Sequence, residues 1–173
     1  MTTTTAPDRT EAAEYYFTYI DQVPGDGDIS RILESQSTET LALLRGIPEE
    51  RSSHRYAPGK WSIRQVVSHL NDTERMFVFR ALWFARGFDS PLPSFDQDIA
   101  IAAAGADARS LSSHAEEFRA VRAAIVTFFQ NLTADAWTRR GVASGNPFSV
   151  RALAYIAAGH VAHHVRILRE RYL

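Results

Sequence analysis

Residues 62–87, SIRQVVSHLNDTERMFVFRALWFARG, are the starting point because their apolar positions have a clear helical period. One face carries Ile63, Val67, Leu70, Phe77, Ala81 and Phe84. This spacing is typical of an amphipathic helix and not of a strand. Ser62 and Gln65 form an S-x-x-Q capping box, and Gly87 is a stop signal. The stretch therefore predicts a long helix between Ser62 and about Gly87.

Three further stretches have the same period, over residues 28–46, about 110–132, and from 149 to near the C-terminus. N-cap residues are expected at Asp28, at Ser110 or Ser113, and at Ser149. Residues 88–110 connect the second and third helices and are expected to hold a short helix around 96–103. A connector of this length favours a crossover over a tight hairpin. Residues 141–149, GVASGNPFS, predict a loop, and no stretch alternates as a strand. The fold class predicted is all-α, a four-helix bundle with a long crossover between helices 2 and 3.

The amino-acid composition argues against several classes of function. The 173 residues suit one domain with a sizeable core, and a formal net charge of −1 gives no reason to expect nucleic acid or an anionic membrane as a partner. The chain has no cysteine, which excludes disulfides, thiolate metal ligands and cysteine nucleophiles. No apolar run approaches the ~20 residues of a membrane span.

The N-terminal residues MTTTTAPDRT have neither the basic region nor the apolar region of a signal peptide. Residues 1–17 are therefore expected to form a loose tail, and residues 18–173 a single bundle domain. A cytoplasmic location is expected.

Three histidines near the C-terminus, in GHVAHHVRILRERYL (159–173), are the main functional signal. His160 and His164 are four residues apart on the apolar stripe of the last helix, so both are expected to face the interior and converge on one point. His163 stands at i+3 from His160 and could replace His164, but it lies further toward the flank. A third ligand should come from a facing helix, and His69 on the second helix is the best candidate. His54 falls in a loop and His114 lies near a helix start.

A lone histidine on an apolar face is more often a hydrogen-bonded core residue than a ligand. The combination of three such histidines argues for a metal site, because three buried neutral imidazoles are costly unless their nitrogens find partners. One divalent ion would supply a partner to all three.

The chain resembles the DinB/YfiT-like superfamily of small metalloenzymes. The resemblance rests on WSIRQVVSHLNDTER (61–75) and AGHVAHHVRILRER (158–171), with support from YIDQVPGDGDI (19–29) and GNPFSVRALAYI (145–156). It implies a four-helix bundle with a long crossover and a divalent metal held by His69, His160 and His164. It further implies nickel or zinc as the metal, a homodimer, and His163 as a non-ligand neighbour.

Three histidine ligands leave at least one coordination position open, which suits a catalytic ion better than a structural one. The first hypothesis is therefore a metal-dependent enzyme acting on a small molecule, either a low-molecular-weight-thiol S-transferase or a hydrolase. The alternative is a non-catalytic helical module in which the ion is structural. Glu74 is a weak candidate for a general base, and a buried ion pair with Arg122 or Arg151 is the favoured alternative.

Other residues have two interpretations each. Asp96 and Asp98 can reach the mouth of the site or cap a helix, and Trp61 can form a lid or a core plug. The aromatic residues of MFVFRALWFARG (76–87) face more than one direction around their helix, which favours a homodimer.

Overall fold

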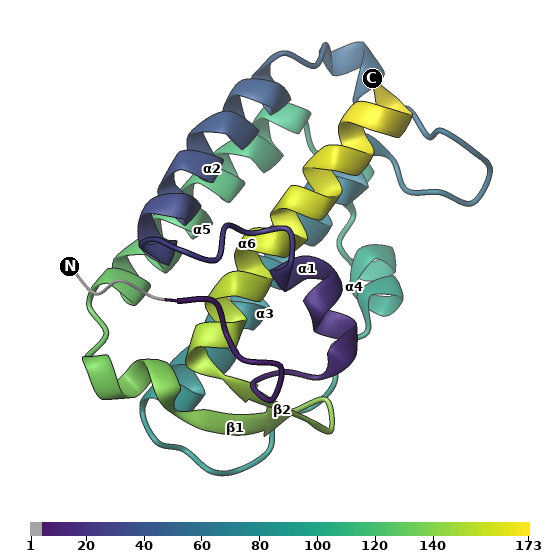
Figure 1. The fold of residues 1–173 in the computed structure, drawn as a ribbon. Coiled ribbons are helices and arrows are strands. Elements are labelled where there is room, and N and C mark those ends of the chain that lie inside the picture. Colours follow the sequence, from purple (N-terminus) through teal and green to yellow (C-terminus); the bar gives the residue numbers. More distant parts are fainter. Residues whose placement is uncertain (1–4) are drawn as a thin grey trace.

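The computed structural model describes residues 5–173 as a bundle of four long helices (Figure 1). The long helices are α2 (Ile29–Arg45), α3 (Ile63–Ala85), α5 (Leu111–Gln130) and α6 (Val150–Ile167), the last continued by a π-helical turn (Leu168–Tyr172). The shorter elements are α1 (Phe17–Ile20), α4 (Gln97–Ala103), β1 (Arg140–Ala143), β2 (Asn146–Ser149) and the 3-10 turns Glu14–Tyr16, Glu49–Arg51, Ala106–Ala108 and Ala134–Thr138. Among the described helices, none has both the length and the apolarity needed to cross a bilayer.

The helix starts follow the capping signals of the sequence. Asp28 accepts a hydrogen bond from the Ser30 amide, and Ser62 with Gln65 forms both bonds of the capping box. Ser110, and not Ser113, caps α5, and Ser149 caps α6 by accepting from the Ala152 amide. The caps therefore fix the residue at which each long helix begins.

Helices α3 and α5 run parallel side by side. The Asn71 side chain donates to the carbonyl of His114, and further along both helices Glu74 meets Arg122. A parallel pair cannot be joined by a tight turn, so residues 86–110 must return along the length of the bundle. This confirms the predicted crossover, which carries α4 as the expected short helix.

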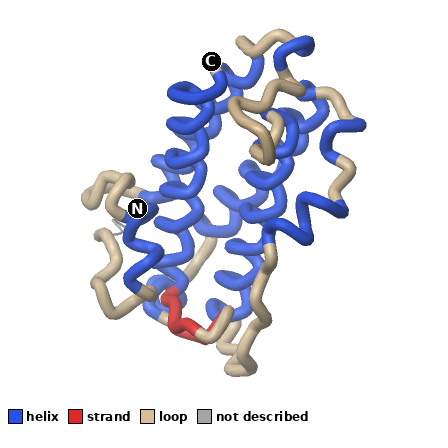
Figure 2. The backbone as a smooth tube through the Cα atoms, turned by 90° about the vertical axis from the view of Figure 1, so that its right-hand side faces the viewer, coloured by secondary structure: helices blue, strands red, loops and turns tan. Residues whose placement is uncertain are grey.

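Residues 140–149 correct the prediction of a loop. They form an antiparallel hairpin in which Ala143 pairs with Asn146 around a two-residue turn. Ser144 and Gly145 both have positive φ angles, of 52° and 72°, as a type I′ turn requires. The hairpin lies at the end of the bundle opposite the C-terminus (Figure 2).

The N-terminal segment also differs from the loose tail expected over residues 1–17, of which the first four lie outside the described residues. Glu11 is buried, pairs with Arg151 of α6, and accepts a hydrogen bond from the Ser149 hydroxyl at 2.6 Å. The N-terminal segment packs on the bundle because this carboxylate and this guanidinium, far apart in the sequence, form an ion pair beside the start of α6.

The bundle interior has two hydrophobic clusters separated by buried polar groups. One cluster holds Phe77 of α3 and Ile156 of α6, and the other holds Leu70 and Val161. Between these residues in the sequence lie Thr73 and Glu74 of α3 and His160 of α6, all buried, and His69 is buried one helical turn from Thr73. The polar groups therefore occupy the middle of the bundle.

Candidate metal centre

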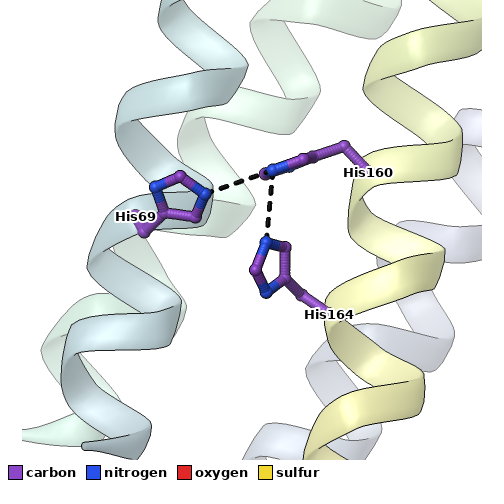
Figure 3. Close-up of side chains that lie close together, drawn as sticks. All are labelled: His69, His160 and His164. Atoms are coloured by element: carbon purple, nitrogen blue, oxygen red, sulfur yellow. Dashed lines mark hydrogen bonds between the residues drawn. The ribbon is translucent and has the colours of Figure 1, made fainter. Parts of the chain in front are cut away.

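His69 of α3 and His160 and His164 of α6 come together between the two helices (Figure 3). His160 Nε2 lies 3.1 Å from His69 Nε2 and 3.2 Å from His164 Nε2. One ligand atom from each ring lies within 4.8 Å of the other two. This brings together the three histidines singled out in the sequence, in an arrangement that could hold a metal ion.

Local helix geometry and close packing position these rings. The i and i+4 spacing places His160 and His164 on one face of α6, and α3 runs antiparallel to it with His69 opposite. Gly159, next to His160, allows α1 to approach, since a Cβ there would lie 2.1 Å from the Tyr19 carbonyl oxygen. The Tyr19 ring consequently packs edge-on against His160 at 5.3 Å between centroids.

Burial keeps all three imidazoles neutral at physiological pH. His69 is 2% exposed and His160 is 5% exposed, while His164 is half-buried. Desolvation lowers the pKa of His69 to about 4 and, with a smaller contribution from His69 and His163, that of His164 to about 3. Burial first, and then the neighbouring histidines, hold the pKa of His160 well below its ordinary value. Neutral imidazole is the form that binds metal.

Thr73 lies beside Nδ1 of His160 and favours one of the two neutral forms of that ring. Thr73 Oγ1 lies 3.4 Å from His160 Nδ1 and donates its own proton to the His69 carbonyl at 2.8 Å. The hydroxyl oxygen can then only accept from His160, which assigns the proton of the neutral ring to Nδ1. His160 Nε2 is therefore an unprotonated acceptor that faces the two other histidines.

This assignment leaves a conflict at the centre of the cluster. His160 Nε2 has one lone pair in the ring plane, and it faces two ring nitrogens at 3.1 and 3.2 Å. One of these nitrogens can donate a proton to it, and the other has no partner at this contact. A cation shared by three lone pairs removes the conflict, so the donor set fits a metal ion.

Two cavities adjoin the cluster. One, of about 220 Å³, is lined by His69, Thr73 and His160, and the other, of about 290 Å³, is lined by His164 and Trp61. Gln97 of α4 lines both cavities. A larger cavity of about 690 Å³ lies beside α2, but no histidine lines it. The chemistry therefore points to the two smaller cavities.

The remaining histidines lie outside the cluster. His163 contacts the Tyr19 ring at 5.5 Å, which agrees with its predicted place on the flank. His114 is buried near the start of α5, where its Nε2 lies 2.9 Å from the Ala106 carbonyl oxygen. His54 packs edge-on against Tyr172.

Glu74 forms the ion pair that was the favoured alternative to a catalytic role. Arg122 donates to its two carboxylate oxygens at 2.6 and 3.0 Å, and both side chains are buried. Both oxygens are thus engaged by the guanidinium. The structure favours the ion pair over a role as general base.

The structure also bears on Asp96, Asp98 and Trp61, for each of which the sequence allowed two interpretations. Asp96 caps α4 by accepting from the amides of Asp98 and Ile99, whereas Asp98 lines the cavity that contains His164. Trp61 is half-buried, and its ring lies 4.9 Å from the His69 ring, so it forms a wall of the site.

Sequence reasoning missed Tyr19, Gln97 and Arg80, which also line the cavity at His160. Tyr19 and Gln97 belong to α1 and α4, and helical period within the long helices says nothing about where such short elements pack. Arg80 was in principle detectable, because it follows His69, Thr73 and Met76 at spacings of four, three and four on one face of α3.

The lowered histidine pKa values predict that the metal-free protein loses stability on acidification. Below about pH 6.5 the histidines of the unfolded chain bind protons, whereas the buried rings do not, so the unfolded state binds more protons and stability falls as pH falls. Each buried histidine contributes a slope of up to about 1.4 kcal/mol per pH unit. Urea unfolding of chelator-treated protein between pH 7 and 5 measures this slope.

His69→Gln is the matched control. It should reduce the pH dependence of the unfolding free energy by the contribution of one histidine, while the contribution of the carboxylates stays the same. Equal slopes for the parent protein and His69→Gln would contradict the assignment of a buried neutral imidazole to His69.

Comparison with known proteins gives a family and two related folds. The model of the DinB superfamily matches residues 32–168. YfiT from Bacillus subtilis, described as a probable metal-dependent hydrolase with an unusual four-helix bundle topology, superposes with a TM-score of 0.74 at 16% identity, covering 95% of this chain and 89% of that chain. A mycothiol-dependent maleylpyruvate isomerase superposes with a TM-score of 0.67 at 12% identity, covering 84% of this chain and 61% of that one. The search of curated proteins found no match. At these identities the two structures show a shared fold.

Proposed function

The chain belongs to the DinB superfamily, and on that premise we propose that it is a divalent-metal-dependent enzyme acting on a small molecule. His69, His160 and His164 would hold the ion. The observation that carries the proposal is the convergence of three neutral imidazoles, with Nε2 of His160 3.1 Å from Nε2 of His69 and 3.2 Å from Nε2 of His164, where one ion can serve all three nitrogens.

The number of ligands supports catalysis. Catalytic zinc sites typically have three protein ligands, whereas structural sites have four. In the part of the chain that the structure describes, no fourth histidine, aspartate or glutamate joins the three in the cluster. Nickel and zinc are the ions proposed, because imidazole ligands suit both.

Residues around the cluster orient the ligands and exclude water. Thr73, as the acceptor assigned to the Nδ1 proton of His160, would keep Nε2 directed at the cluster. Trp61, Tyr19 and Phe77 place their rings against the histidines at 4.9 to 5.7 Å. When bound, the ion supplies a Lewis acid that can lower the pKa of a water or thiol. Asp98 is the one carboxylate residue among those lining the two cavities, and it is our candidate for proton transfer.

Two reactions are compatible with this site, low-molecular-weight-thiol S-transfer and hydrolysis. Each has support from a protein of the same fold, one described as mycothiol-dependent and one as a probable metal-dependent hydrolase. The chain has no cysteine, so a thiol must enter as a substrate.

The alternative is a structural ion that joins α3 to α6 without chemistry. The two proposals differ in what removal of the ion does. Untagged protein would be stripped with a chelator, reloaded with zinc or nickel, and assayed with thiol-transfer and hydrolase substrates. Activity that returns with the ion supports the enzyme. If the reloaded protein converts none of the thiol-transfer or hydrolase substrates, and stripping the ion lowers the melting temperature, the structural ion is supported.

The proposed homodimer would use an aromatic surface near the end of α3. Phe79 and Phe88 are 50% and 52% exposed, and Trp83 stacks on Phe88 at 4.2 Å between centroids. We expect a dimer in sedimentation velocity at micromolar concentration, and Phe79→Glu should shift it toward monomer, because a charge disfavours burial at an apolar interface. A monomer in the parent protein would contradict this proposal.

A cytoplasmic location stays a prediction.

A further inference from the structure

Arg80 is a buried cation in the cavity that adjoins the histidine cluster. Arg80 is only 3% exposed. It lines the cavity of about 220 Å³ together with His69, Thr73 and His160. Burial lowers the pKa of Arg80, yet a guanidinium remains protonated at neutral pH. The cavity therefore contains a positive charge.

The partners of this cation are all neutral. Arg80 Nη2 donates to the Pro93 carbonyl oxygen at 3.0 Å and to Ser144 Oγ at 2.9 Å, and the Tyr16 phenol interacts with the guanidinium. Among the described residues, no carboxylate forms an ion pair with it. Buried charges in proteins are normally paired, as Arg122 is with Glu74.

The lining of the cavity limits what the missing anion can be. Arg80 is the one residue of the arginine, lysine, aspartate and glutamate types among the lining residues. The unpaired guanidinium calls for one negative group on the ligand, and an ion at the histidines would add its own charge to the site. The fork of donors on a guanidinium matches the two oxygens of a carboxylate.

The remaining lining groups suit a small ligand with an uncharged body. Met76, Phe77 and Phe95 supply apolar contacts, and Tyr16 and Gln97 supply polar ones. The volume of about 220 Å³ is below the ~300–1,000 Å³ typical of drug-sized ligands. His69 and Arg80 both come from α3 and line the same cavity, so one ligand can contact both.

We propose that Arg80 binds the carboxylate of a small monoanionic substrate whose other end reaches the three-histidine cluster. As a substrate subsite this rests on the proposed function, but carboxylate binding itself does not require the ion. The subsite orients the substrate by its charged end, so the reacting group lies toward His69 and His160.

The two methionines of the chain allow a residue-specific test. In protein labelled with ¹³C at the methionine methyl groups, Met76 reports on the cavity that it lines. Metal-free and zinc-loaded proteins are each titrated with hexanoate, with hexanamide as the uncharged analogue, and with inorganic phosphate. We expect a saturable shift of the Met76 signal with hexanoate in both forms, and little or none with hexanamide.

Arg80→Gln should weaken hexanoate binding by about 10- to 100-fold, the usual effect of losing a charged hydrogen-bonding partner. Arg86→Gln is the matched control, because Arg86 is exposed at the end of the same helix and its loss changes the net charge equally. We expect it to bind hexanoate as the parent protein does.

Several outcomes would overturn the proposal. These are equal shifts with hexanoate and hexanamide, a response to phosphate alone, no response at all, or parental binding by Arg80→Gln. Should Arg80→Gln fail to fold, the comparison of hexanoate with hexanamide on the parent protein decides the question. If zinc does not bind but hexanoate still shifts Met76, the proposed function fails and the carboxylate site stands.

Discussion

His160→Ala is expected to lower the affinity for zinc or nickel by more than about 100-fold. His160 Nε2 is the central atom of the cluster, within 3.2 Å of both other ring nitrogens, so its loss removes one of three ligands. Changing an outer partner of a metal ligand alone typically costs about 10- to 100-fold in affinity, and losing the ligand should cost more. Isothermal titration calorimetry on untagged protein measures this directly.

His163→Ala is the matched control for this variant. It removes an imidazole from the same turn of α6, but one that contacts the Tyr19 ring and lies outside the cluster. We expect parental affinity. Thr73→Val should fall between the two, because it removes the acceptor that holds the His160 proton on Nδ1. Equal losses in His160→Ala and His163→Ala would argue against a site formed by the three histidines.

Glu74→Ala is expected to lower the free energy of unfolding by about 3–5 kcal/mol, the usual cost of removing one partner from a buried ion pair. Arg122 would keep its hydrogen bond to Gln36 Oε1 at 2.9 Å, but its charge would have no counter-charge at 0% side-chain exposure. Urea unfolding of the metal-free protein gives the measurement.

The control is Glu116→Ala, which removes an exposed ion pair with Arg119 on the surface of α5. Such pairs contribute about 0–1 kcal/mol. A double variant, Glu74→Leu with Arg122→Met, should recover much of the lost stability, because apolar residues often replace buried ion pairs without cost. If Glu74→Ala were as stable as Glu116→Ala, the pair would not have the structural role that we assign to it.

The histidine cluster was predictable because its geometry is local to two long helices. His160 and His164 are four residues apart, and His69 lies beside the apolar stripe that faces them. The caps Asp28, Ser62 and Ser149 were predictable for the same reason, since a cap acts within three residues of itself.

The parts that were not predicted depend on contacts between distant segments. The two strands of the hairpin at 140–149, RGVA and NPFS, do not alternate between polar and apolar residues, so no period of two indicated them. The packing of residues 5–17 depends on Glu11 meeting Arg151, 140 positions away. Arg80 could be placed on the face of His69 by its spacing, but its burial beside Pro93 and Ser144 follows from the crossover and the hairpin.

Anomalous diffraction from zinc-soaked crystals of the untagged protein tests the central claim most directly. We expect one anomalous peak about 2.0–2.1 Å from Nε2 of each of His69, His160 and His164, the usual zinc–imidazole distance. A structure in which the three rings hydrogen-bond to one another, with zinc absent or bound elsewhere, would contradict the claim. The histidines would then be polar core residues, and the enzyme proposal would fall with them.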